Sequence, residues 1–253
     1  MNVSPGFWAR LTPMIQVTNL KKAFRTKLSG QGTIQSVLFP KYQSFQAVDD
    51  VSFGVAQGEI LGLLGPNGAG KTTIIKILAG LLQPTSGSAL IDGMPAERQR
   101  ARIGLVLGST MIYNRITGYE NLEYYADLYG VDRVKERIGS LAESLGLTFR
   151  MGEYVEHYST GMKAKLAYAR ALIADPDVLI LDEPTLGLDI KVARDIRKAI
   201  LNSGKTVLIT THCTEEAQEL SDRVIILKNG RISKTMCDPQ TAEIESGIIN
   251  EDA

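Results

Sequence analysis

The chain has 253 residues, 44% of them hydrophobic, with equal numbers of basic and acidic side chains, 28 of each. This length and apolar content suit one large domain, or one domain with a smaller subdomain, and exclude a disordered chain. The balanced charge provides no overall basic field, so nucleic acid is not an expected partner. Two cysteines, Cys213 and Cys237, are too few for a disulfide scaffold and lack metal-site spacing, which favours reduced thiols in a reducing compartment.

Membrane-spanning and secretory segments are not indicated by the hydropathy pattern. No apolar run approaches the roughly 18–20 residues that cross a bilayer, and residues 1–13 lack the apolar stretch of a secretory signal. We therefore expect a cytoplasmic chain that reaches a membrane only through partner proteins. Residues 1–13 are expected to form an extension outside the main fold, and residues 246–253 a C-terminal tail.

Strands and helices are predicted in alternation along most of the chain. The first part predicts strands at 14–20, 48–56 and 59–64 with an inserted loop at 26–44, then a helix at 70–82 and a strand at 102–107. Residues 117–146 predict two helices broken near Gly130, and 161–174 predict another. The last part predicts strands at 178–181, 207–210 and 224–227, helices at 189–202 and 215–220, and a turn at Asn229-Gly230.

This order predicts an α/β fold. The run at 59–64 is almost wholly apolar, which is typical of a strand buried on both faces of a sheet. The βαβα pattern at both ends predicts a mainly parallel sheet core over 14–107 and 176–245. The helical stretch between them predicts a subdomain inserted at 108–175.

A glycine-rich loop lies between the apolar strand and the first helix. It fits the pattern G-x-x-x-x-G-K-[ST] and comprises Gly65, Pro66, Asn67, Gly68, Ala69, Gly70, Lys71 and Thr72, with Thr73 following. Glycines let backbone N–H groups converge on phosphates, and the helix N-terminus adds partial positive charge. Lys71 is expected to contact the β- and γ-phosphates and Thr72 to place its hydroxyl on Mg²⁺. The loop therefore predicts a nucleotide site, but kinases, GTPases and helicases share it.

Two adjacent carboxylates end the apolar run at 178–181. Because side chains alternate along a strand, Asp182 and Glu183 are expected to face different atoms. Asp182 is the candidate metal ligand, direct or through water, at the carboxyl end of a parallel strand, where α/β folds bind ligands. Glu183 is the candidate general base that polarises the water attacking the γ-phosphate.

The segment Tyr158-Ser159-Thr160-Gly161-Met162-Lys163 opens a helix shortly before this strand and looks like the ABC signature Leu-Ser-Gly-Gly-Gln. With the motifs in this order, residues 14–240 resemble an ABC ATPase. The resemblance implies a P-loop NTPase (RecA-like) core, an antiparallel β subdomain and an inserted α-helical subdomain. It also implies that the signature completes the ATP site of a second subunit, identical or different, through the nucleotide-binding residues Ser159, Thr160, Gly161 and Met162.

The same resemblance assigns further residues. Leu186-Gly187-Leu188-Asp189 looks like the loop whose aspartate crosses the dimer interface, and His212 takes the position of the switch histidine that contacts the γ-phosphate. Lys71, Glu183 and His212 are thus the catalytic candidates. Phe24 is the best positional match for the aromatic ring that stacks on adenine, with Tyr42 and Phe45 as rivals.

The chain departs from the family pattern at two points. The residue after Gly161 in the signature is Met162 where the family has glutamine, which removes a polar contact. The loop after the strand at 102–107 has Gly108, Ser109 and Thr110 where the family has a glutamine that touches Mg²⁺. Ser109 is therefore a weak metal-ligand candidate, and a water could take that place.

The motif forms resemble the ABC-2-type branch, which is associated with export. This implies a subunit that uses ATP and Mg²⁺ to energise transport through separate transmembrane permease subunits, at the cytoplasmic face of the membrane. Two alternatives are a soluble ABC ATPase that remodels a protein complex and an ATP-binding regulatory module without turnover. The intact set of Lys71, Asp182, Glu183 and His212 argues against the last.

Overall fold

The apolar run at 60–64 forms an inner strand of a six-stranded sheet in the computed structural model, which describes residues 13–27, 42–107 and 111–237. The strand order is β10-β9-β3-β8-β7-β6, with β10 antiparallel to β9 and the other neighbours parallel. The strands are β3 (Ile60–Leu64), β6 (Ile103–Leu107), β7 (Val178–Asp182), β8 (Thr206–Thr211), β9 (Arg223–Lys228) and β10 (Arg231–Cys237). The predicted mainly parallel core is confirmed, and β10 is added beyond the predicted turn.

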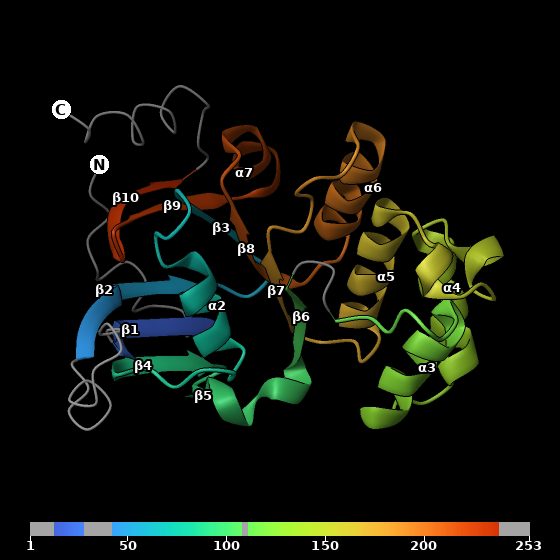
Figure 1. Ribbon diagram of the computed structural model, residues 1–253, viewed down its shortest axis with the longest axis horizontal. Coiled ribbons are helices and arrows are strands. Elements are labelled where there is room, and N and C mark those ends of the chain that lie inside the picture. The colour runs from blue at the N-terminus through green and yellow to red at the C-terminus, as the bar shows by residue number, and fades with distance from the viewer. Residues whose placement is uncertain (1–12, 28–41, 108–110, 238–253) are drawn as a thin grey trace, which may run out of the picture.

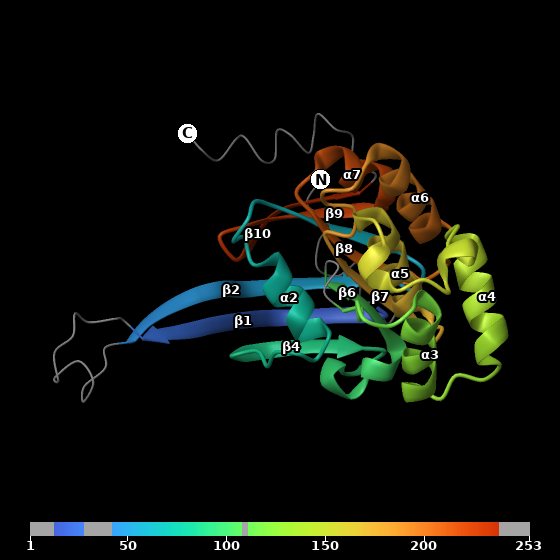
Figure 2. The same cartoon turned by 45° about the vertical axis from the view of Figure 1, so that its right-hand side comes forward.

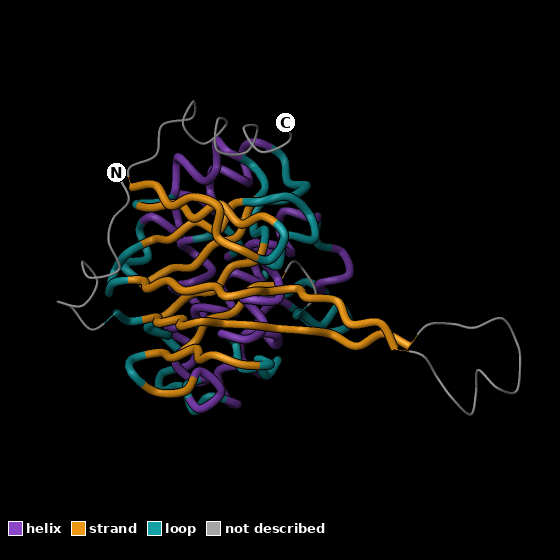
Figure 3. The backbone as a smooth tube through the Cα atoms, turned by 90° about the vertical axis from the view of Figure 1, so that its left-hand side faces the viewer, coloured by secondary structure: helices purple, strands orange, loops and turns teal. Residues whose placement is uncertain are grey.

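A second, antiparallel sheet has the order β2-β1-β4-β5. Its strands are β1 (Ile15–Lys27), β2 (Tyr42–Val55), β4 (Ser86–Ile91) and β5 (Met94–Pro95). The far ends of β1 and β2 form a hairpin that projects from the rest of the molecule (Figures 2 and 3). The short strands β4 and β5 are not among the predicted elements.

The predicted loop at 26–44 is wrong at both of its ends. β1 continues to Lys27 and β2 begins at Tyr42, and the two strands pair there in register. Three register shifts between Val17 and Ala23 interrupt the regular alternation along β1. Such bulges hide the period of two that identifies a strand in a sequence. Residues 1–12, 28–41 and 238–253 lie outside the described part of the chain. They include all but the last residue of the expected extension at 1–13 and all of the expected tail at 246–253.

The helices agree closely with the predicted ranges. They are α2 (Lys71–Leu78), α3 (Gly118–Leu128), α4 (Val134–Ser144), α5 (Thr160–Leu172), α6 (Ile190–Leu201) and α7 (Thr214–Leu220), with 3₁₀ turns at Ala96–Arg98, Arg100–Arg102, Thr148–Arg150 and Val155–His157. The predicted break at Gly130 is confirmed, since this residue follows α3 with φ 64°. α2 ends before the predicted 82 because Gly80 adopts φ 67°.

The parallel sheet is buried on both faces, as its continuous apolar strands predict. Along β7 and β8, Leu179 and Val207 face one core with α3, α4 and α5, whereas Ile180 and Leu208 face the other core with α2 and the antiparallel sheet. Figure 1 shows α2 between the two sheets and the α3–α5 block on the opposite side. The two cores hold the sheet rigidly, which suits an edge that positions reactive groups.

The parallel register brings the carboxyl ends of four strands to one edge. Leu64 pairs with Thr211, Asp182 pairs with Thr210, and Leu107 pairs with Asp182. The residues that follow β3, β7 and β8 therefore meet there, which is where α/β folds bind ligands. Within residues 13–27, 42–107 and 111–237, none of the helices has both the length and the apolar character needed to cross a membrane.

Candidate functional site

The glycine-rich loop connects the end of β3 directly to the first residue of α2. Gly70 has φ 104°, and a Cβ there would lie 2.5 Å from the carbonyl oxygen of Ala47, so only glycine fits. A Cβ at Gly65 would collide with the carbonyl oxygen of Leu227. Gly68, by contrast, has φ 84° and faces open space. Packing thus requires Gly65 and Gly70, while Gly68 leaves the loop surface free to approach a ligand.

Lys71 lies under this loop with 5% of its surface exposed. Its Nζ donates to the carbonyl oxygens of Gly65 and Pro66, and it lies 3.8 Å from Oε1 of Glu183. Burial lowers the pKa of Lys71, and the nearby carboxylates of Glu183 and Asp182 oppose that shift. Phosphate oxygens at the loop would give the ammonium stronger acceptors than two neutral carbonyls.

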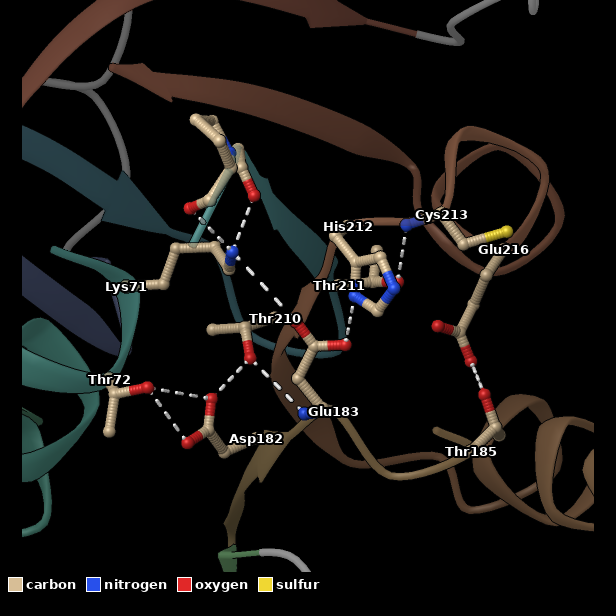
Figure 4. A network of polar contacts seen from close by, with 12 residues as sticks. Lys71, Thr72, Asp182, Glu183, Thr185, Thr210, Thr211, His212, Cys213 and Glu216 are labelled. Atoms are coloured by element: carbon tan, nitrogen blue, oxygen red, sulfur yellow. Dashed lines mark hydrogen bonds and ion pairs between the residues drawn. The ribbon is translucent and has the colours of Figure 1, made fainter. Parts of the chain in front are cut away.

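Thr72 and Asp182 come together from α2 and β7 (Figure 4). The Thr72 hydroxyl lies 3.1 Å from Oδ2 of Asp182, and the Thr210 hydroxyl donates to Oδ1 at 2.5 Å. Hydroxyl and carboxylate oxygens side by side fit Mg²⁺, which usually takes one or two protein oxygens and completes its shell with water and phosphate. The described residues hold no group of three or more His, Cys, Asp or Glu side chains arranged around a metal position.

Glu183 and Asp182 contact different side chains, as predicted, but alternation along a strand is not the reason. β7 ends at Asp182, and Glu183 turns out of the strand with φ 50°. Its backbone N–H is held by the carbonyl oxygen of Thr210 at 3.1 Å and contacts the Thr210 hydroxyl at 3.2 Å. Because its conformation is strained for a residue with a Cβ, the surrounding hydrogen bonds must hold it.

His212 lies immediately beyond β8 and contacts Glu183. Its Nδ1 is 2.7 Å from Oε2 of Glu183, so a proton on Nδ1 is donated to the carboxylate. Both oxygens of Glu183 are therefore engaged, one by His212 and the other by Lys71. The structure thus gathers the three catalytic candidates, Lys71, Glu183 and His212, from three different segments (Figure 4).

The signature-like segment begins α5. Ser159 is its N-cap, and the Ser159 hydroxyl accepts from the Met162 N–H at 3.2 Å. Ser159 and Thr160 are exposed, whereas Met162 is partly buried against the core of the α3–α5 block. Gly161 is buried, and a Cβ there would lie 2.9 Å from the Val192 side chain. Glycine at this position therefore permits close packing of α5 on α6.

Asp189 caps α6, accepting from the Val192 N–H at 3.0 Å. The loop in which it lies is exposed, and two large apolar side chains nearby are mainly in solvent: Leu186 is 62% exposed and Ile190 82%. Thr160, Glu183 and Leu186 line a common cavity of about 70 Å³. The start of α5 thus lies beside the turn that carries the candidate base.

Phe24 lies in β1 on the projecting hairpin, directly opposite Phe45 in β2. It is 38% exposed, against 58% for Phe45 and 61% for Tyr42, and the Lys22 ammonium lies 5.2 Å from the centre of its ring. Thr73 is half-buried beside Thr72 at the start of α2. Ser109 lies outside the described residues.

Thr210 is a residue of the candidate site that sequence reasoning missed. It is fully buried, and its hydroxyl contacts both Asp182 and the backbone of Glu183. The signal was available, because Thr210 precedes Thr211-His212 at the end of an apolar strand. A hydroxyl at that position in a parallel sheet lies beside the end of the neighbouring strand.

The fold and this edge define a P-loop NTPase, the class that binds nucleoside triphosphates at a glycine-rich loop between strand and helix. The ABC transporter family model matches residues 48–186, more than half of the chain. The chain therefore belongs to the ABC transporter family, and within it to the ATP-binding proteins.

Two curated relatives illustrate the similarity. The chain is 42% identical over 202 residues to the ABC transporter ATP-binding protein NatA of Bacillus subtilis, covering 76% of this chain and 82% of NatA. It is 37% identical over 236 residues to the Nod factor export ATP-binding protein I of Ralstonia nicotianae, covering 90% of this chain and 68% of the relative. Other relatives are longer, and the chain spans 63% and 65% of two of them.

A solved structure confirms the fold. The dimeric, post-hydrolysis ATP-binding cassette MJ0796 with ADP and Pi superposes with a TM-score of 0.76, covering 90% of this chain and all of that one at 24% identity. The expected P-loop NTPase fold is thus confirmed, and hydrolysis of ATP is the activity that the family implies.

Proposed function

We propose that this chain is the subunit that binds and hydrolyses ATP to drive transport, in the export direction, through separate transmembrane subunits. The convergence of Lys71, Asp182, Glu183 and His212 at one sheet edge carries the proposal. A regulatory module without turnover would not need a carboxylate held between a lysine and a histidine.

The chemistry follows from the positions of these side chains. The triphosphate binds along the backbone N–H groups of the loop, and Lys71 leaves the carbonyls of Gly65 and Pro66 for its oxygens. A water attacks the γ-phosphorus while the bond to the β–γ bridging oxygen breaks. Glu183 accepts the proton of that water, and His212 orients Glu183 and contacts the γ-phosphate.

Mg²⁺ would be held by Thr72 and Asp182 and would neutralise charge on the β- and γ-phosphates. Thr210 keeps Asp182 aligned for this task through its hydroxyl. A water molecule would take the remaining Mg²⁺ ligand position, for which Ser109 was the sequence candidate.

We propose that a second ATP-binding subunit, identical or different, closes the ATP site. Ser159 and Asp189 are exposed, and among the described residues the side chain of each caps its own helix. Exposed Leu186 and Ile190 beside Asp189 provide the apolar surface that association would bury. In the proposed dimer the start of the partner's α5, with Ser159, Thr160, Gly161 and Met162, faces the γ-phosphate across the interface.

We propose that the adenine ring of ATP stacks on Phe24. This ring is the least exposed of the three candidate aromatics, and the Lys22 ammonium beside it would add a positive charge near the bound nucleotide. Tyr42 lies further toward the far end of the hairpin, opposite Lys27, and Phe45 lies directly opposite Phe24.

The α3–α5 block is proposed to dock the permease at the cytoplasmic face of the membrane. Five aromatic side chains in or beside it are well exposed: Tyr113 (47%), Tyr124 (50%), Tyr129 (44%), Phe149 (98%) and Tyr154 (52%). Tyr113 and Tyr124 pack edge to face at 5.4 Å, which keeps them rigid in a surface suited to a partner helix. Export as the direction rests on the motif forms and on the name of the Nod factor export relative.

The experiment that tests transport is purification of the chain with its native membrane fraction in detergent. A co-purifying integral membrane protein, and ATP-dependent export by vesicles containing both, are the expected results. Recovery of soluble partners alone would instead support a remodelling ATPase. Tyr124→Ala should release the membrane protein while leaving ATP affinity unchanged, whereas Lys71→Ala should retain it and lose ATP binding.

A further inference from the structure

A buried carboxylate lies behind the catalytic edge. Glu216, in the first turn of α7, is 3% exposed and lies four residues after His212. Its Oε1 accepts from the hydroxyl of Thr185, which is 9% exposed and lies two residues after Glu183 (Figure 4). One hydrogen bond therefore joins the segment that carries the histidine to the segment that carries the base.

The two segments that this bond joins are short and locally constrained. The Thr185 turn is closed by Leu186 N–H to the carbonyl of Glu183 and Leu188 N–H to the carbonyl of Thr185, both at 3.2 Å. On the other side, His212 lies in the single connection between β8 and α7, where Cys213 N–H donates to the Thr211 hydroxyl at 3.0 Å. Moving either end of the Thr185–Glu216 bond would therefore move a catalytic side chain.

A cation completes the surroundings of Glu216. The Nε of Arg197, in α6, lies 3.8 Å from Oε1 of Glu216, while its Nη1 forms a 2.6 Å bond with Glu219. α6 is the helix that Asp189 caps. Glu216 follows His212 in the chain. Its carboxylate thus contacts both the turn that follows Glu183 and helix α6.

We infer that Glu216 is a positioning residue for ATP hydrolysis, which holds His212 against Glu183 through its contact with Thr185. The inference rests on the proposed function, in which these two residues perform the chemistry. Among the described residues, Glu216 and Thr185 form no hydrogen bond or ion pair with Lys71 or Thr72, the residues proposed to bind phosphate and metal. Breaking the contact should therefore slow turnover without weakening ATP binding.

The expected loss follows from geometry. Misplacing a catalytic group by about 1 Å can reduce a rate by roughly 100-fold, and loss of one tether among several should cost about tenfold. Glu216→Ala should lower kcat by about that factor and change the ATP Kd by less than about twofold. Glu215→Ala is the matched control, because Glu215 occupies the same helical turn but is exposed, and its kcat should be unchanged.

The decisive measurement is a double-mutant cycle with His212→Ala, followed under single-turnover conditions so that slow rates are resolved. If Glu216 acts through His212, Glu216→Ala should produce no further loss in the His212→Ala background. An equal loss in both backgrounds would show a merely structural role and overturn the inference, as would wild-type kcat in Glu216→Ala.

A second pair of variants covers the case in which Glu216→Ala does not fold. Thr185→Val removes the hydroxyl at nearly constant volume and should lower kcat about tenfold, whereas Thr185→Ser should restore it. Equal kcat in the two variants would overturn the inference. Absence of ATP hydrolysis by the wild-type chain would contradict the proposed function itself, and with it this inference.

Discussion

The edge of the parallel sheet and the exposed starts of α5 and α6 hold their polar side chains in different ways. At the sheet edge, Lys71, Asp182 and Glu183 are each held by partners from other strands or loops. At the helix starts, Ser159 and Asp189 are exposed, and the side-chain hydrogen bond that each forms within the described residues goes to the backbone of its own helix. The first region is organised within one chain, and the second is available to another molecule.

This difference suits two separate tasks: hydrolysis of ATP at the sheet edge, and closure of the ATP site by a second subunit at the helix starts. Groups that move protons must be fixed before substrate arrives, which requires buried partners. Groups that close a site must stay accessible until a partner reaches them. Substitutions at the edge should therefore reduce turnover, and substitutions at the helix starts should reduce association.

The largest effect should come from Glu183→Gln. An amide cannot accept the proton of the attacking water, and loss of a general base typically costs 100- to 10,000-fold. ATP affinity should stay within about threefold, because the phosphate loop is intact, and the variant should accumulate as an ATP-bound dimer. Steady-state hydrolysis, nucleotide titration and light scattering measure the three quantities. Near-normal turnover would reject Glu183 as the base.

Ser159→Ala should act on association rather than on the hydrolytic edge. In the Glu183→Gln background it should weaken ATP-dependent dimerisation about tenfold, as judged by analytical ultracentrifugation. The control is Thr117→Ala, which removes an equivalent cap from α3. Both changes should cost about 1 kcal/mol of folding stability. If the two variants dimerise equally well, Ser159 has no role beyond capping.

Phe24→Ala should weaken ATP binding about fivefold, the effect expected from losing a stacking contact of about 1 kcal/mol on a partly exposed ring. GTP binding should be affected similarly, since stacking does not depend on the identity of the base. Phe45→Ala and Tyr42→Ala are the controls on the same hairpin and should change the affinity less. Equal affinities in all three variants would defeat the assignment.

The smallest effect concerns the ion pair between α5 and α6. Lys165 lies 2.7 Å from Asp195, and its hydrogen bond lowers the pKa of Asp195, against the opposing effect of burial. A lowered folded-state pKa adds stability above the unfolded pKa of about 3.9, and that stability is lost as pH falls through the folded value. Because Asp195 is 42% exposed, its share should be below about 1 kcal/mol. Asp195→Asn should make the free energy of unfolding, measured by urea denaturation, less dependent on pH below pH 4. The same pH dependence as in the wild type would contradict this.

The sheet edge was predictable because its signals are local in the sequence. A loop pattern between an apolar run and a helix locates Lys71 and Thr72, and strand ends locate Asp182 and His212. Contacts between distant segments were not predictable in this way. The Thr210 hydroxyl on Asp182, the Val192 side chain on Gly161 and the Thr185–Glu216 bond depend on register and helix packing, and the hairpin pattern of β1 is interrupted by bulges.

ATP hydrolysis is thus assigned to the sheet edge, and closure of the ATP site to the helix starts of a second subunit. An atomic structure of Glu183→Gln with ATP and Mg²⁺ tests this assignment most directly. The expected result is a dimer in which Nζ of Lys71 has left the carbonyls of Gly65 and Pro66 for the β- and γ-phosphates, with Ser159 of the opposite copy on the γ-phosphate. A nucleotide bound away from Lys71, or a dimer with Ser159 far from both nucleotides, would contradict it.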